Sequence, residues 1–348
     1  GAVFYPPNPA ASYIRGNRHP GMDPLIDRFG TEILWPANQV AAMPHVTDKN
    51  KVISDITEWK EQLVMPDLQA NCSDPALWEP FIKKADEIRA NGDLVMAFMP
   101  TGVFERLHFL MGFEDMLMNY LLEPEDMMDL CNAIGEYRFQ YMKLIVDYIK
   151  PDVMLSHDDW GSKHSLFISP ETWREFIKPQ YAKTYKYMKD HGVIVMHHAD
   201  SFLEPIIEDM VDLGIDIWQG ALPENDIPKL QKQLNGRMTL MGGIDAAIVD
   251  RADSTEEEIR KEFMEMIKLL EEGKLQEFKQ KATECPPVDI AEGLEEIEDE
   301  GRVLRVFRML PKDISSDVFS YMTSEQQQLI AESATNAELK ALVDDMFM

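Results

Sequence analysis

Cysteine is scarce in this chain of 348 residues, and its three copies, Cys72, Cys131 and Cys285, lie far apart with no Cys-x-x-Cys pair. This spacing excludes a disulfide framework and a paired-cysteine metal site, and it fits a reducing compartment. No uninterrupted apolar run reaches the roughly 18 residues of a membrane helix, and no signal-peptide pattern opens the chain. We therefore expect a cytoplasmic protein that does not act on a membrane.

Basic residues are also few, since 34 Lys and Arg stand against 62 Asp and Glu, for a net charge of -28. A chain this acidic repels phosphate backbones, so no nucleic-acid partner is expected. The Gly-x-Gly-x-x-Gly dinucleotide motif, a phosphate loop and a serine-nucleophile elbow are absent as well. The length is sufficient for one large domain and a smaller one.

Short apolar runs alternate with longer amphipathic stretches between about residues 90 and 270. The runs cover residues 94–100, 152–159, 193–200, 215–220 and 238–245. Each run is too short for a helix and is bounded by turn residues, which is typical of a buried parallel strand. Val3–Tyr5 and Glu32–Trp35 could be earlier strands. The alternation predicts a parallel α/β fold.

Polar side chains gather where these predicted strands end: His157, Asp158, Asp159, His198, Asp200, Gln219 and Asp245. In parallel α/β folds, and above all in barrels, the carboxyl ends of the strands form the active-site face. We therefore predict that these residues lie on the active-site face.

His198 and Asp200 are the predicted metal ligands. Strand alternation places both on one face and His197 on the other. An imidazole and a carboxylate two positions apart can share one divalent ion, and zinc accepts such nitrogen and oxygen ligands. The alternative is that the two side chains only hydrogen-bond to each other and to the neighbouring loop.

His157, Asp159 and Asp245 are the predicted catalytic residues. His157 and one of the two acids that follow it could supply a third ligand or a general base, whereas the other acid caps a turn. Asp245, after Gly242 and Gly243, could bind a ligand or orient a histidine. The alternative for Asp245 is a helix cap after a tight turn.

Trp160, Trp218 and Gln219, at or near strand ends, are the predicted cofactor-binding residues, with the two rings as walls of an apolar pocket. Core packing is the more frequent role of such rings.

Beyond residue 273 the pattern changes to short amphipathic helices, with no further strand-like run. Such helices of similar length predict a small all-α superhelix. We place the domain boundary between residues 272 and 273.

Five segments, at residues 152–162, 169–181, 197–202, 214–220 and 241–247, resemble the uroporphyrinogen decarboxylase superfamily in order and spacing. The resemblance covers about residues 2–270 and implies a TIM (β/α)8-type barrel, here without a recognisable last strand. The arginine-rich N-terminal motif of the decarboxylase is absent, and the chain looks more like the corrinoid-dependent methyltransferases. Those enzymes carry zinc on a His-x-Cys motif, which aligns with His198 and Asp200.

This resemblance implies a metal-dependent methyl transfer to or from a small-molecule substrate, with a corrinoid protein as partner and a homo-oligomer left open. The segments 286–297, 304–330 and 336–347 resemble the intracellular N-terminal domain of MgtE-type magnesium transporters. Two alternatives follow. One is cofactor-free decarboxylation of an acidic tetrapyrrole, and the other is a non-catalytic, magnesium-responsive or scaffolding role.

Overall fold

The computed structural model describes residues 3–10, 19–38, 41–243, single positions between 255 and 268, and 275–333 apart from 296 and 298. Two compact units, Gly1–Leu240 and Met241–Met348, are each considered separately. Asp245, the predicted boundary at 272–273 and the predicted last helix at 336–347 lie outside the described residues. The boundary therefore stays a prediction.

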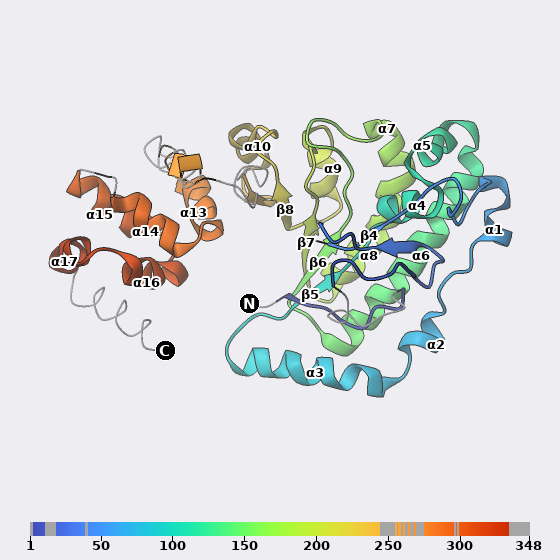
Figure 1. Ribbon diagram of the computed structural model, residues 1–348, viewed down its shortest axis with the longest axis horizontal. Helices are drawn as coiled ribbons and strands as arrows, with labels where there is room; N and C mark the ends of the chain where they lie inside the picture. The colour runs from blue at the N-terminus through green and yellow to red at the C-terminus, as the bar shows by residue number, and fades with distance from the viewer. Residues whose placement is uncertain are drawn as a thin grey trace. The chain divides into compact units, whose positions relative to one another are not determined.

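A six-stranded sheet lies at the centre of the first unit (Figure 1). Its spatial order is β1 (Val3–Phe4), β5 (Met96–Met99), β6 (Val153–His157), β7 (Ile194–His198), β8 (Ile217–Ala221) and β9 (Thr239–Gly242). The pairs from β1 to β8 are parallel. The predicted parallel α/β fold is confirmed, and a strand overlaps each of the five apolar runs.

The central strands explain why the runs read as almost continuously apolar. Val153 and Met154 are successive residues of β6, so they face opposite sides of the sheet, and both are buried. Val195 and Met196 repeat this arrangement on β7. Strands covered on both faces need apolar side chains at successive positions.

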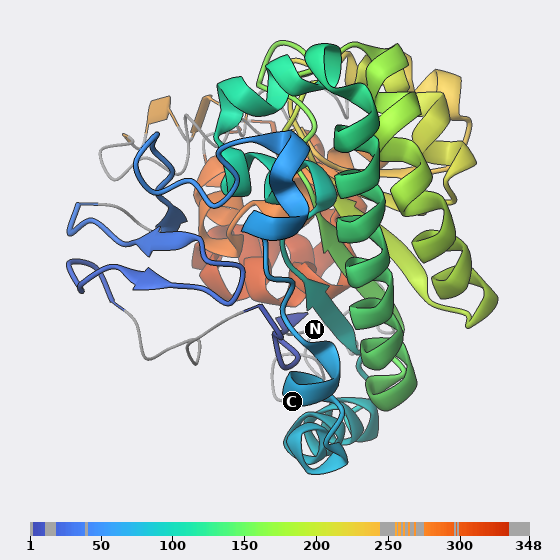
Figure 2. The ribbon, with the colours of Figure 1, turned by 90° about the vertical axis from the view of Figure 1, so that its right-hand side faces the viewer.

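A second, antiparallel sheet joins β2 (Leu25–Ile26), β3 (Glu32–Leu34) and β4 (Met43–Pro44). Figure 2 shows it in blue, apart from the parallel strands. Both early strands expected from the sequence exist, but they belong to different sheets. Within the described residues the parallel sheet is open and ends at β1 and β9.

Ten α-helices are described in the first unit. They are α1 (Trp59–Gln62), α2 (Leu68–Cys72), α3 (Pro75–Ala90), α4 (Val103–Met111), α5 (Phe113–Leu122), α6 (Pro124–Ile149), α7 (Pro170–Thr172), α8 (Lys178–Asp190), α9 (Ile207–Asp212) and α10 (Ile227–Leu234). Helix α8 packs against β7. Short turns at Ile56–Glu58 and Glu204–Ile206 and a π-helical turn at Trp173–Ile177 complete the unit.

Local sequence signals explain where these helices begin. Ser169 accepts a hydrogen bond from the Thr172 backbone N–H at 3.1 Å, and Pro170 takes the first helical position of α7. This is the cap expected from the sequence. In α6, the buried residues Met127, Leu130 and Ile134 follow helical spacing and turn one stripe to the core.

The described part of the second unit contains α13 (Leu275–Glu284), α14 (Pro287–Glu295), α15 (Glu300–Met309), α16 (Lys312–Tyr321) and α17 (Ser324–Ser333). It has its own apolar core, which includes Ile290, Leu294 and Val306. The expected helical C-terminal region is confirmed. In the part of the chain that is described, no helix combines the length and apolarity needed to cross a bilayer.

Candidate metal site at the strand ends

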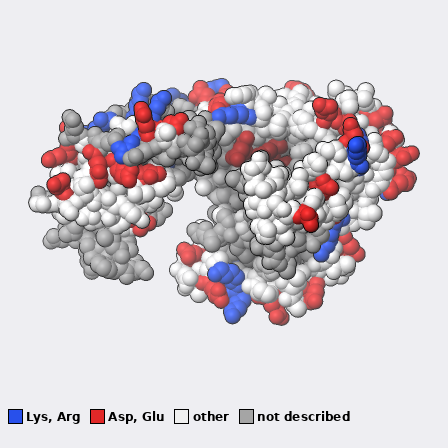
Figure 3. Space-filling view, in the orientation of Figure 1, with Lys and Arg blue, Asp and Glu red and all other residues white. Residues whose placement is uncertain are grey.

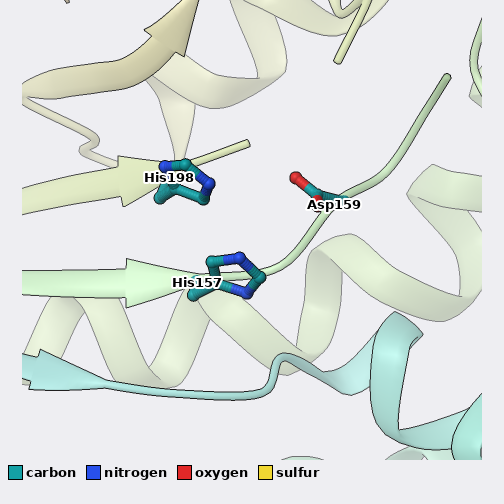
Figure 4. Close-up of side chains that lie close together, drawn as sticks. All are labelled: His157, Asp159 and His198. Atoms are coloured by element: carbon teal, nitrogen blue, oxygen red, sulfur yellow. The ribbon is translucent and has the colours of Figure 1, made fainter. Parts of the chain in front are cut away.

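Three side chains at the carboxyl ends of β6 and β7 offer ligand atoms that all lie within 4.8 Å of one another: His157, Asp159 and His198. Figure 4 shows the two imidazoles side by side with the Asp159 carboxylate turned toward them. His157 and His198 end neighbouring strands and are register partners. Their rings stack, with centroids 4.6 Å apart and planes 14° from parallel.

Each imidazole has its Nδ1 atom engaged by an oxygen acceptor. The Nδ1 of His157 lies 2.7 Å from Oε2 of Glu105, and the Nδ1 of His198 is hydrogen-bonded to Oε1 of Gln219. A donating Nδ1–H leaves the lone pair on Nε2. Histidine ligands of metal ions are oriented in this way, with the second ring nitrogen donating to a carboxylate or carbonyl.

Glu105 reaches the site from the first turn of α4, where its Oε2 also accepts from the Gly102 backbone N–H at 3.3 Å. Burial alone would lower the pKa of His157, but the hydrogen bond and charge of Glu105 outweigh burial and raise that pKa to about 9. The pKa of Glu105 is correspondingly lowered, because the same hydrogen bond overcomes the effect of burial. Without a metal ion the two groups form an imidazolium–carboxylate pair at neutral pH.

The two acids of the loops differ in burial. Asp159 accepts a hydrogen bond from the Asp200 backbone N–H at 2.9 Å, and burial raises its pKa against the opposing charge of His157. The Asp200 side chain is 59% exposed, with Oδ2 3.6 Å from Nε2 of His198. The structure thus brings Asp159 to the two histidines and leaves Asp200 at the exposed rim beside His198.

Asp158 points into the protein, away from the ligand cluster. Its fully buried carboxylate accepts from the backbone N–H groups of Phe104 (3.0 Å) and Glu105 (2.9 Å). It also accepts from Trp160 Nε1 at 2.8 Å and the Tyr181 hydroxyl at 2.5 Å. Asp158 therefore caps α4, the helix that carries Glu105, rather than a local turn.

The remaining predicted site residues take other positions. Trp160 and Trp218 are fully buried in the core, where Trp160 stacks on His197 at 3.9 Å and Trp218 donates to the Ala199 carbonyl at 3.0 Å. Core packing was the alternative role for these rings. Gln219 supports His198 by a hydrogen bond, and Asp245 lies outside the described residues.

Glu105 was missed by the sequence analysis. The available signal was an acid in the first turn of a helix that begins directly after the predicted strand at 94–100. That position is at the carboxyl end of a parallel strand, where site residues gather.

Comparisons with known proteins identify two families. The family model described as uroporphyrinogen decarboxylase (URO-D) matches residues 86–278, and that of the MgtE intracellular N domain matches residues 285–348. A search of curated proteins found no match. Among solved structures, a methyltransferase from Methanosarcina mazei is similar, with 16% identity, a TM-score of 0.49, and coverage of 70% of this chain and 67% of that chain.

The URO-D match spans more than half of the chain, and it includes β5 to β9 with all three side chains of the ligand cluster. The resemblance recognised from the sequence is confirmed. The chain belongs to the uroporphyrinogen decarboxylase family and carries a C-terminal segment that matches the MgtE intracellular N domain.

Proposed function

We propose that this chain is an enzyme that binds a divalent metal ion through His157, Asp159 and His198. Zinc is the first candidate for this ion. The observation that carries the proposal is the convergence of these three ligand groups within 4.8 Å. Two nitrogen donors and one carboxylate are a donor set that zinc accepts in catalytic sites, where a further position stays open for water or substrate. Asp200, at the rim, is available for that position or for the substrate.

The surroundings of the two imidazoles support a metal ion. Glu105 and Gln219 come from different elements, α4 and β8, and each engages the Nδ1 of one ring. This arrangement stabilises both ring orientations before an ion arrives, and a metal ion would displace the Nε2 proton of His157 on binding.

For the reaction we propose methyl transfer between a small oxygen-bearing substrate, such as a methyl ether, and a corrinoid partner protein. A bound divalent ion would supply Lewis acidity to the substrate heteroatom. The corrinoid-dependent relatives resembled by the sequence bind zinc through a thiolate. A His/Asp donor set is harder, which favours an oxygen over a sulfur ligand. The methyl group would pass to the reduced corrinoid, and the alkoxide that remains would take up a proton from water at the rim, where Asp200 lies exposed beside His198.

Decarboxylation of an acidic tetrapyrrole is less well supported. Such a substrate carries many carboxylates and requires a cationic cleft. The strand ends instead present Asp159, Asp200 and Glu105 beside the two histidines.

Metal content tests the first part of the proposal. Purified wild type should contain about one equivalent of zinc after loading and dialysis, and His198→Ala should retain at least about tenfold less because one of three ligands is lost. His191→Ala is the matched control, since His191 is exposed and bonds only to the Tyr187 carbonyl. Equal, negligible metal in all three proteins would contradict the proposal.

The methyl transfer itself is measured with reduced cobalamin as the probe and an aryl methyl ether as donor. Zinc-loaded wild type should convert the reduced corrinoid absorption to that of methylcobalamin, and His198→Ala should not. A zinc-replete wild type that is inactive with ethers and with other methyl donors would remove the methyl-transfer assignment while leaving the metal site.

A further inference from the structure

A small cavity lies beside the strand ends but does not include the ligand cluster. Its volume is about 30 Å³, and it lies between α4, α6, the segment after β1 and the turn after β5. The residues that line it include Asn8, Thr101, Arg106, Tyr137, Arg138 and Tyr141. None of the three proposed metal ligands is among them, so this is a separate feature of the first unit.

The cavity gathers the buried cations of the protein. Among the described residues, Arg106 and Arg138 are the buried basic side chains, with 6% and 4% exposure, and both line this cavity. The net charge of the chain is -28, so buried positive charge is not a by-product of composition. Burying a cation is unfavourable unless an anion or strong acceptors surround it.

These two cations are compensated by different contacts, which include the Phe29 ring 4.1 Å from the Arg106 guanidinium and the Tyr181 ring 5.1 Å from that of Arg138. Arg106 pairs with Asp27 at 3.0 Å. Arg138 makes no ion pair within the described part of the chain, and donates instead to the Thr101 carbonyl and the Ser156 hydroxyl at 3.2 and 2.9 Å. Thr101 itself adopts a φ of 53°, a conformation that non-glycine residues rarely take. Strained residues of this kind concentrate at ligand sites.

Two hydroxyl donors at the cavity remain unused. Arg106 donates from Nη1, and Arg138 donates from Nε and Nη2, the latter also to the His157 carbonyl at 3.4 Å. Tyr185 is a further side-chain hydrogen-bond partner of Arg138. Among the described residues, the buried cavity-lining atoms that lack a partner are the hydroxyls of Tyr137 and Tyr141. Buried donors without acceptors are unfavourable, and a ligand that accepts from them relieves that cost.

We propose that this cavity binds the carboxylate group of a small anionic ligand. Guanidinium groups present planar donors that match the two oxygens of a carboxylate. The cavity has room for about two water molecules, which is the size of one carboxylate group and far smaller than a tetrapyrrole. The proposal does not depend on the metal site, since it uses neither the ligand residues nor a bound ion.

Formate is the probe, used with the full chain and compared with chloride at equal ionic strength. Formate should raise the melting temperature saturably, by roughly 5 °C once its concentration exceeds the dissociation constant about 100-fold. Arg138→Lys keeps the charge but loses the planar pair of guanidinium donors, so formate binding should weaken at least about tenfold. Arg237→Lys is the control, since Arg237 forms an exposed pair with Glu208, and it should bind formate like the wild type.

Butyrate distinguishes two sources of the carboxylate. Competition between butyrate and formate indicates the carboxylate of a longer ligand, whereas binding of formate alone indicates a free small anion. If Arg138→Lys does not fold, Arg106→Lys, which keeps a charge opposite Asp27, replaces it with the same expected loss. Formate that stabilises wild type no more than chloride, or that binds the folded lysine variant as tightly as wild type, overturns the proposal.

Discussion

The two units of this protein differ in what they bury. The interior of the first unit contains charged and polar side chains, among them Arg106, Arg138, Asp158 and His197. In the described part of the second unit the buried side chains are apolar, apart from Ser316. Acidic side chains of both units are visible on the molecular surface in Figure 3. The second unit thus follows the simplest pattern, with apolar stripes inside and charges outside.

The difference indicates that the first unit is the one that holds reactive side chains in place. A buried polar group is unfavourable unless its hydrogen bonds are satisfied, so a network of such groups needs a reason to persist. In the first unit the network begins at Asp158, passes through α4 to Glu105 and ends at His157. The helical unit has no comparable network among its described residues.

The largest expected effect comes from removing the centre of this network. Asp158→Ala leaves four donors without their acceptor, and we expect it to lower the free energy of unfolding by about 3–5 kcal/mol. Urea unfolding followed by tryptophan fluorescence measures it, because all six tryptophans precede residue 219. Asp226→Ala, which removes only the N-cap of α10, should cost about 1 kcal/mol. Equal losses in the two variants would show that the buried network contributes no more to the free energy of unfolding than a single helix cap.

In the second unit the corresponding variant creates a cavity in the apolar core instead of removing a hydrogen bond. Leu294 is fully buried in the apolar core, so Leu294→Ala should cost about 3 kcal/mol. Val288→Ala, on the same helix but 37% exposed, should cost less than about 1 kcal/mol. Hydrogen exchange of peptides from α14 and α15 reports both. Similar protection in the two variants would show that this core is not closely packed.

The support of the metal site gives a smaller effect. Gln219→Ala removes the acceptor for Nδ1 of His198 but no ligand, so zinc affinity should fall about 10- to 100-fold with the fold intact. Competition with a chelating dye measures the affinity. Gln233→Ala, an exposed glutamine bonded to Glu208, is the control. Unchanged zinc affinity in Gln219→Ala would show that the hydrogen bond that orients the His198 ring does not contribute to metal binding.

The smallest effect concerns a peripheral ion pair of the first unit. Burial opposes ionisation of Asp209, but hydrogen bonds from Arg174 and Lys178 outweigh it and lower its pKa. A lowered folded-state pKa stabilises the protein above the unfolded pKa of about 3.9, and this contribution disappears as pH falls through the folded value. Asp209→Asn should therefore cost about 1 kcal/mol at pH 7.

The difference between wild type and Asp209→Asn should shrink when urea unfolding is repeated below pH 4. Asp190→Asn, which removes an exposed pair with Lys186, should cost less than about 0.5 kcal/mol at either pH. A pH-independent difference for Asp209→Asn would assign its effect to packing instead of charge.

Local sequence patterns predicted the elements of the fold and part of the site. Apolar runs bounded by turn residues identified β5 to β9, because burial on both faces leaves a continuous apolar signal. Strand alternation correctly separated the buried His197 from the half-buried His198. The gathering of His157, Asp159 and His198 follows from the rule that strand ends share one face.

Tertiary contacts could not be predicted from local sequence patterns. The bond from Glu105 to His157 joins residues 52 positions apart, and the bond from Asp158 to the α4 backbone joins residues 53 positions apart. Periodicity carries no information about which acid faces a distant helix end. For the same reason the sequence favoured Asp200, two residues from His198, whereas in the structure Asp159 lies within 4.8 Å of both histidines. The role of Asp159 as a metal ligand is part of the proposed function.

The register between β6 and β7 also restricts how this family can vary. Because His157 and His198 are paired across two adjacent strands, inserting or deleting one residue within either strand would place a neighbour such as Ser156 opposite the other histidine. Length changes should therefore accumulate in the loops after the strands, where they alter substrate choice without moving the paired rings. A change of loop length at the rim can therefore leave the paired rings in place, whereas a change of strand length cannot.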